Sequence, residues 1–319
     1  MNIKCLSQHK FCVFSGKFSR VVLSQHETTL TYYGLKIMAM EDVIRMNQEE
    51  HVLNEKNILR SISHPFLISL THSTMDTRFL YLLFPFIPGG ELFSYLRSVR
   101  RFPASTAMFY TAEVVSALDY LHSLHIIYRD IKLENLLLDR QGHLKIVDFG
   151  FAKIVRDRTW TMCGTPEYIA PEIILNKGYT ISVDWWALGV LVYEMVVGHP
   201  PFRDKNIMDL YEKILEGQIE WPIGVVIQTD VREFVSRLLS REEDRLGCEG
   251  RGSMEVMDHR WLKHLDWEQV REGKLQPPII PQILHKGDCG NYQEYREELW
   301  WEVEEISRRE REVFRGFET

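Results

Sequence analysis

The sequence predicts an α+β fold with a small β-rich lobe, a larger helical lobe and an extended C-terminal tail. Runs of aromatic and β-branched residues, which strands favour, dominate the first part of the chain. Apolar residues at helical spacing dominate the middle. The stretch LQPPIIPQI at 275–283 is too rich in proline for a helix and predicts the tail. We place the lobes at 1–85 and 86–265, with a connector at 85–90 and the tail at 266–319.

In the first lobe, residues 11–38 hold three short segments of strand character separated by turns. Residues 41–60 change to helical spacing, and two further strands are predicted near 67–71 and 79–84. Prolines and glycines at 85–90 then interrupt the pattern, which indicates a connector between the lobes.

In the second lobe, residues 105–124 form a long amphipathic helical pattern. Two short strands are predicted within 135–148, on either side of the turn sequence DRQG. Residues 184–198 are apolar nearly all round, so that helix is expected to be buried in the larger lobe.

The composition excludes several classes of protein. A net charge of −7 argues against a nucleic-acid-binding protein, which needs a clustered basic excess. The five cysteines form no C-x-x-C pair, which favours free thiols in a reducing compartment. No secretory signal and no apolar run of membrane-spanning length is apparent. We expect a cytoplasmic or nuclear protein with no nucleic-acid partner and no membrane insertion.

Two motifs carry the chemistry: YRDIKLEN at 128–135 and, after a strand-turn-strand pattern, VDFG at 147–150. Either alone carries little information, and solvated loop charges are the alternative interpretation. In this order and context the pair is typical of protein kinases. Asp130 is the expected catalytic base that orients the attacking hydroxyl, and Lys132 can reach the transferred phosphate. Asn135 and Asp148 offer the oxygen ligands that Mg²⁺ needs when it is bound with ATP.

Lys36 lies at the end of a predicted strand, and Glu55 lies on the helix that follows. Upstream of the two motifs, this lysine is expected to bind the α- and β-phosphates while Glu55 holds it. The alternative is that Lys36 is simply solvated, as a lysine at the end of a strand usually is.

The phosphate-covering loop departs from the kinase pattern G-x-G-x-x-G-x-V, which aligns with FSGKFSRV at 14–21. Only Gly16 remains, while Phe14 and Ser19 replace the outer glycines. Glycine lets the backbone approach phosphate closely, so these changes predict weakened nucleotide affinity. A weakly active or inactive scaffold is the alternative function.

Further segments carry a closer resemblance: LNEK at 53–56, RTWTMCGTPEY at 158–168, APE at 170–172, DWW at 184–186 and PPF at 200–202. With them, the chain from about residue 10 onward resembles the cAMP-dependent protein kinases, within the AGC-type Ser/Thr kinases. The resemblance implies the bilobal kinase fold and transfer of the ATP γ-phosphoryl group to serine or threonine. A tyrosine kinase fits poorly, because Lys132 and the GTPE segment follow the Ser/Thr pattern.

The resemblance also implies an activation segment. Thr161 matches its phosphorylation site, and Arg129, Lys153 and His51 match the phosphate ligands. Thr165 matches the catalytic threonine that bonds the base and its lysine. Glu172 matches the partner of a buried arginine, here Arg245.

For substrates, the resemblance implies basic proteins. Glu91, Glu134 and Glu212 match the carboxylates that bind substrate arginines, and Met162, Pro166 and Ile169 match the apolar pocket for the residue after the target. A cAMP-binding regulatory subunit, docking at Trp160, and a pseudosubstrate inhibitor are the other implied partners.

For ATP, the implied binding residues are Phe14, Gly16, Val21, Lys36, Glu55, Ile87, Glu91, Leu137 and Tyr292. Phe84 matches the residue at the back of the adenine pocket, and Tyr292 the tail aromatic that covers the ring. FRGF at 314–317 matches a docking motif of the tail for the small lobe. Residues 297–314 are interpreted either as an amphipathic helix or as a solvated tail.

Overall fold

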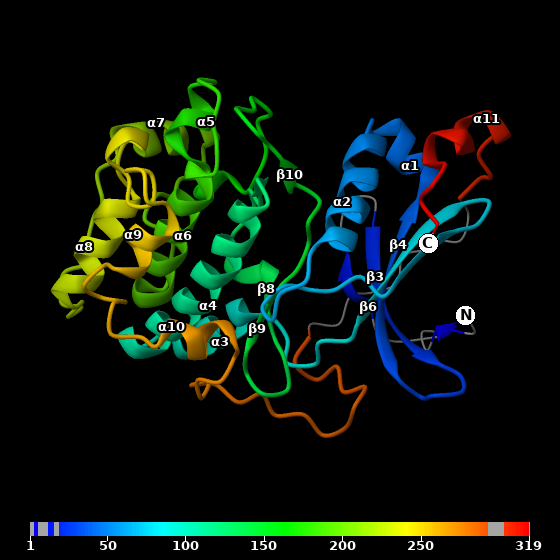
Figure 1. The fold of residues 1–319 in the computed structure, drawn as a ribbon, viewed down its shortest axis with the longest axis horizontal. Coiled ribbons are helices and arrows are strands. Elements are labelled where there is room, and N and C mark those ends of the chain that lie inside the picture. Colours follow the sequence, from blue (N-terminus) through cyan, green and yellow to red (C-terminus); the bar gives the residue numbers. More distant parts are fainter. Residues whose placement is uncertain (1–2, 6–11, 16–18, 293–302, 319) are drawn as a thin grey trace.

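The computed structural model describes residues 3–5, 12–15, 19–292 and 303–318. Figure 1 shows a sheet lobe and a helical lobe side by side, joined by a narrow connection. This arrangement confirms the α+β class. In the described residues, no helix is both long enough and apolar enough to cross a bilayer.

The first lobe is built on a six-stranded sheet with the order β1-β3-β4-β6-β5, in which β2 pairs with the same strand, β3, as β1 does. Its strands are β1 (Ile3–Cys5), β2 (Cys12–Ser15), β3 (Ser19–His26), β4 (Tyr32–Ala39), β5 (His72–Met75) and β6 (Phe79–Pro85). The three strands predicted within 11–38 are confirmed, and β1 is additional. The strand predicted near 67–71 is wrong. Leu67 and Ile68 are buried in the main core, and β5 begins only at His72.

Two helices replace the single one predicted over 41–60: α1 (Met40–Arg45) and α2 (Glu49–Ser61). The interruption falls at Asn47, whose φ of 51° is left-handed and cannot continue a right-handed helix. The second helix, α2, has a buried face that includes Glu55.

The second lobe surrounds two long helices. The predicted helices are confirmed as α4 (Ala104–Ser123) and α6 (Ser182–Val197), and α6 is buried along nearly its whole length. Its other helices are α3 (Leu92–Val99), α5 (Pro171–Ile174), α7 (Ile207–Glu216), α8 (Thr229–Leu238), α9 (Ser253–Met257) and α10 (Trp267–Arg271). This lobe also contains two small sheets, β8 (Leu136–Leu138) with β9 (Leu144–Ile146) and β7 (Ile126–Ile127) with β10 (Lys153–Ile154).

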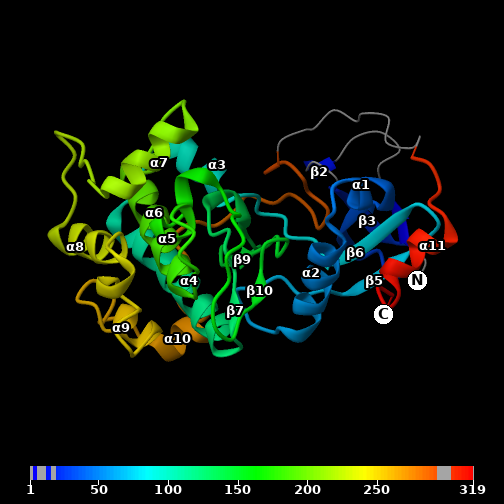
Figure 2. The same cartoon turned by 90° about the horizontal axis from the view of Figure 1, so that it is seen from above.

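The tail returns from the helical lobe to the sheet lobe (Figures 1 and 2). Residues 275–283 form neither helix nor strand, as predicted. Phe314 and Phe317 are fully buried in the main core, which confirms the docking of FRGF. Residues 303–307 are not helical, so an amphipathic helix through this part is wrong, and α11 spans only Arg308–Arg311.

Candidate active site between the lobes

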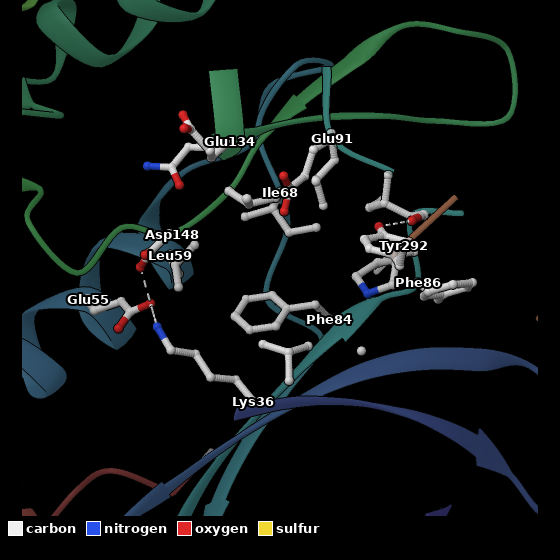
Figure 3. A pocket seen from close by; sticks show the side chains of 17 residues that line it. Lys36, Glu55, Leu59, Ile68, Phe84, Phe86, Glu91, Glu134, Asp148 and Tyr292 are labelled. Atoms are coloured by element: carbon white, nitrogen blue, oxygen red, sulfur yellow. Dashed lines mark hydrogen bonds and ion pairs between the residues drawn. The ribbon is translucent and has the colours of Figure 1, made fainter. Parts of the chain in front are cut away.

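A cavity lies between the lobes, and its walls come from both of them (Figure 3). Val21, Gly34 and Lys36 come from the sheet, Glu55 from α2, and Leu137 from β8. The lining includes these residues expected at the nucleotide or metal from the sequence: Val21, Lys36, Glu55, Ile87, Glu91, Asn135, Leu137, Asp148 and Tyr292. It also includes Glu134, which was expected to bind substrate arginine. The fold thus brings most of the expected nucleotide site around one space.

Lys36 extends from β4 into this cavity toward two carboxylates (Figure 3). Its Nζ lies 2.7 Å from Oε1 of Glu55 and 3.5 Å from Oδ1 of Asp148. Burial acts to lower the pKa of Lys36, but the charges of Glu55 and Asp148 raise it above its ordinary value. The lysine is therefore held as a cation at the cavity wall, where it can bind polyphosphate.

Asp130 lies at the centre of a hydrogen-bonded cluster. Thr165 Oγ1 donates to its Oδ1 at 2.9 Å, and Lys132 Nζ lies 2.8 Å from its Oδ2 and 2.9 Å from Thr165 Oγ1. Asn135 Nδ2 also donates to Oδ2 at 2.8 Å. Asp130 itself is only 3% exposed, so these donors hold the carboxylate in one orientation.

The backbone at both motifs is strained. Arg129 and Asp148 take φ values of 70° and 57°, which are uncommon for residues other than glycine. Asp184 of α6 supports the first of them, because its carboxylate accepts the N–H groups of Tyr128 and Arg129 at 3.0 and 2.8 Å. A buried helix of the large lobe thus fixes the loop that carries Asp130.

The donor chemistry at Asn135 and Asp148 suits Mg²⁺. Asn135 uses its Nδ2 on Asp130, so its amide oxygen is the atom that it can offer a cation. Burial acts to raise the pKa of Asp148, but Lys36 and the Gly150 N–H hold it below its ordinary range, so the carboxylate is ionised. One carboxylate and one amide oxygen fit a cation that keeps water and phosphate oxygens as its other ligands.

Two further carboxylates, Glu91 and Glu134, line the cavity and form an acidic group with a third, Glu194. The pKa of Glu91 is raised to about 7 by burial and by the negative charge of Glu134. Glu194 of α6 belongs to the same group, since burial and the charge of Glu134 act to raise its pKa too. Arg97 Nη2 lies 3.1 Å from Glu194 Oε1, so one cation of the chain already binds there. Glu212, by contrast, is exposed on α7, and none of the interactions described for this chain links it to the group.

The three residues expected to bind a phosphate on Thr161 of the activation segment bind other groups of the chain. The guanidinium of Arg129 donates to Phe151 O at 2.5 Å and to Tyr179 Oη at 2.9 Å, while Tyr179 Oη donates to the carbonyl of Thr161 at 2.6 Å. Lys153 Nζ donates to Thr159 Oγ1, and His51 pairs with Gln48. The Thr161 side chain is exposed, and it is not among the described partners of the three expected ligands.

Three residues were expected to form the apolar pocket for the substrate residue that follows the phosphorylated one, and they lie in or beside the activation segment. Met162 is 54% exposed, Pro166 begins a short 3-10 turn, and Ile169 is buried beside Gly164. They offer apolar surface of different depth next to the Asp130 cluster.

The phosphate-covering loop is described at its two ends, Phe14 and Ser19. Phe14 pairs with Val21 in the β2–β3 ladder, and Ser19 is a buried residue at the start of β3. The prediction at Gly16 lies outside the described residues.

Sequence reasoning missed Glu194 and Tyr179. Glu194 lies inside the apolar run 184–198, and a carboxylate in a run that must be buried was an available signal. Tyr179 carries no such signal, because only the fold brings its hydroxyl between Arg129 and Thr161.

Comparisons with known proteins agree with this geometry. The family description "Protein kinase domain" matches residues 12–262. "cAMP-dependent protein kinase catalytic subunit 3" of Drosophila melanogaster is 52% identical over 306 residues, which cover 96% of this chain and 52% of the fly protein. "cAMP-dependent protein kinase catalytic subunit PRKX" of Homo sapiens is 48% identical over 306 residues, which cover 96% of this chain and 85% of the human protein. The chain thus spans about half the length of the fly relative and most of the human one.

Proposed function

The chain belongs to the protein kinase family, and from this premise we propose that it transfers the γ-phosphoryl group of ATP to serine or threonine in arginine-containing proteins. The observation that carries the proposal is the meeting of two clusters at one cleft. Lys36 is held by two carboxylates and is proposed to bind the phosphates. Asp130 is held by Lys132 and Thr165 and is proposed to bind the acceptor hydroxyl.

The chain's own residues would act by positioning and by charge. Asp130 accepts a hydrogen bond from the substrate hydroxyl and takes its proton as the new O–P bond forms, while the bond between the γ-phosphorus and the bridging oxygen of ATP breaks and ADP leaves. Lys132 offers its ammonium group to the transferred phosphoryl oxygens, while Thr165 fixes the base. Mg²⁺, held by Asp148 and Asn135, would neutralise phosphate charge.

Transfer of labelled phosphate to a peptide of the form Arg-Arg-x-Ser-hydrophobic, with Mg-ATP, tests the proposal. The enzyme should be phosphorylated at Thr161, and Asp130→Asn is the matched control, because it keeps the size of the side chain and removes the base. Turnover no higher than that of the control would reject the kinase reading in favour of a scaffold.

The scaffold alternative rests on the phosphate-covering loop, and Phe14→Gly tests it. Restoring glycine at this position should lower KM for ATP several-fold, because the backbone could then approach the phosphates. We expect kcat at saturating ATP to change little, since the Asp130 cluster is untouched. Ser19→Gly is the comparison and should have the smaller effect. Steady-state kinetics with varied ATP would show an unchanged or higher KM if Phe14 is not the cause of weak binding.

The raised pKa of Glu91 predicts a pH-dependent preference for arginine. Above pH 7 this carboxylate is ionised and attracts a guanidinium; below pH 7 it is increasingly neutral. KM for the arginine peptide should therefore rise as the pH falls from 8 to 6, by up to about tenfold per unit below the pKa.

Glu91→Gln should flatten this KM profile, and Glu212→Gln, at an exposed carboxylate outside the cluster, should leave it unchanged. If the KM profile changes in Glu212→Gln and not in Glu91→Gln, the substrate arginine binds at Glu212 on α7 and not at Glu91.

A cAMP-binding regulatory subunit is the partner suggested by the relatives, whose names describe catalytic subunits of cAMP-dependent kinases. Trp160 supports this, because it is 57% exposed on the activation segment while its indole packs on Gly178. Retention on an immobilised regulatory subunit, with release by cAMP, is the corresponding test.

A further inference from the structure

The connector between the lobes presents a short edge of backbone polar groups to the cavity. Phe86 N–H donates to Tyr32 O of the sheet, and Leu83 O accepts from Thr71 N–H on the other side. Backbone groups alternate along an extended chain, so Pro85 and Ile87, which line the cavity, face the same side as Leu83. Proline has no N–H. The connector therefore offers three hydrogen-bonding groups in a row: Pro85 O accepts, Ile87 N–H donates and Ile87 O accepts.

The last of these groups is already bonded within the chain. The hydroxyl of Tyr292, from the tail, donates to Ile87 O (Figure 3). Burial raises the pKa of this phenol above its ordinary value, so it stays protonated and remains a donor.

The neighbouring Asn291 holds the tyrosine in place. Its Nδ2 donates to Pro88 O at 3.1 Å and to Gln282 O at 3.0 Å. Gly90, at φ 76°, permits this approach, because a Cβ there would lie 2.3 Å from Asn291 O. The position of the hydroxyl is thus built by the tail and the connector together.

We propose that the Tyr292 hydroxyl makes the site selective for purines that use only the first two groups of this edge. The inference rests on the proposed binding of ATP. Adenine matches those two groups, since its 6-amino group donates to Pro85 O and its N1 accepts from Ile87 N–H. Its C2–H then faces Ile87 O, where no hydrogen bond is required. A purine with a 2-amino group would place a donor at that carbonyl and meet the hydroxyl already bonded there.

The test compares ATP with the triphosphate of 2,6-diaminopurine riboside, which adds only the 2-amino group. Binding of both to the full chain with Mg²⁺ is measured by calorimetry. The wild-type protein should bind the diamino nucleotide no more tightly than ATP. Tyr292→Phe keeps the ring and frees Ile87 O, so the ratio of the two dissociation constants should shift by roughly fivefold toward the diamino nucleotide, as one net hydrogen bond allows.

Asn291→Ala is the matched control, because it loosens the tail and keeps the hydroxyl. It should weaken both nucleotides equally and leave their ratio unchanged. The inference is wrong if the ratio of the two dissociation constants is unchanged in Tyr292→Phe, or if it shifts equally in both variants. The hydroxyl would then only hold the tail in place, and the proposed function would be unaffected. If the wild-type protein binds no ATP, the proposed function fails, and this inference fails with it.

Discussion

Replacing Asp148 by alanine is expected to abolish magnesium-dependent phosphoryl transfer, with kcat lower by about 10³-fold or more. Asp148 is the carboxylate that the cavity offers to the cation, and its pKa is held low, so it is ionised at any pH where the enzyme works. The variant should still fold. The Asp148 side chain is 38% exposed, and Lys36 keeps Glu55 at 2.7 Å as a buried partner.

Two measurements separate the metal role of Asp148 from the base role of Asp130. The gain in melting temperature with ATP should depend on Mg²⁺ in the wild-type protein and in Asp130→Asn, and it should lose that dependence in Asp148→Ala. Turnover should be lost in both variants. Magnesium-dependent turnover at the wild-type rate in Asp148→Ala would show that the metal is held elsewhere.

Much of the fold could be predicted, because the pattern of each element is local. The long helices α4 and α6 are mostly apolar runs without proline, and both are too long for a strand. The errors fall where tertiary contacts decide. The helix over 41–60 breaks at Asn47, and Leu67 and Ile68 pack into the core and form no strand. At Leu67 and Ile68 a short apolar run fits a strand as well as a buried loop, so the sequence pattern alone could not decide between them. At Asn47 the polar run 47–51 fits the exposed face of one helix as well as a break between two.

The candidate site divides in the same way. Asp130, Asn135 and Asp148 belong to two short motifs, so their types and spacing indicated their chemistry directly. The acidic group was predicted only in part. Glu91 and Glu134 line one cavity, but the exposed Glu212 lies outside the group and the buried Glu194 lies within it. The hydroxyl of Tyr292 reaches Ile87 O from a distant part of the chain, and only the path of the tail determines that contact.

The largest expected effect on stability concerns Arg245, whose side chain is completely buried. Its guanidinium binds both carboxylate oxygens of Glu172, at 2.6 and 3.0 Å, and the carbonyl of Ser182 at 2.9 Å. It also lies over the ring of Trp186. Arg245→Ala would leave the buried carboxylate of Glu172 without its cation, which costs about 3–5 kcal/mol in free energy of unfolding.

This loss should lower the melting temperature by on the order of 10 °C. Arg237→Ala is the matched control, because Arg237 pairs with Glu249 at the surface, where both side chains are at least 40% exposed, and it should cost about 1 kcal/mol or less. If Arg245→Ala does not fold, Arg245→Met combined with Glu172→Gln removes both charges and should recover part of the stability in urea titrations. Equal losses for Arg245→Ala and Arg237→Ala would mean that the buried pair is no more important than a surface one. Because Glu172 directly follows the segment that carries Thr165, a large loss at Arg245 would also tie the stability of the helical lobe to the placement of the catalytic threonine.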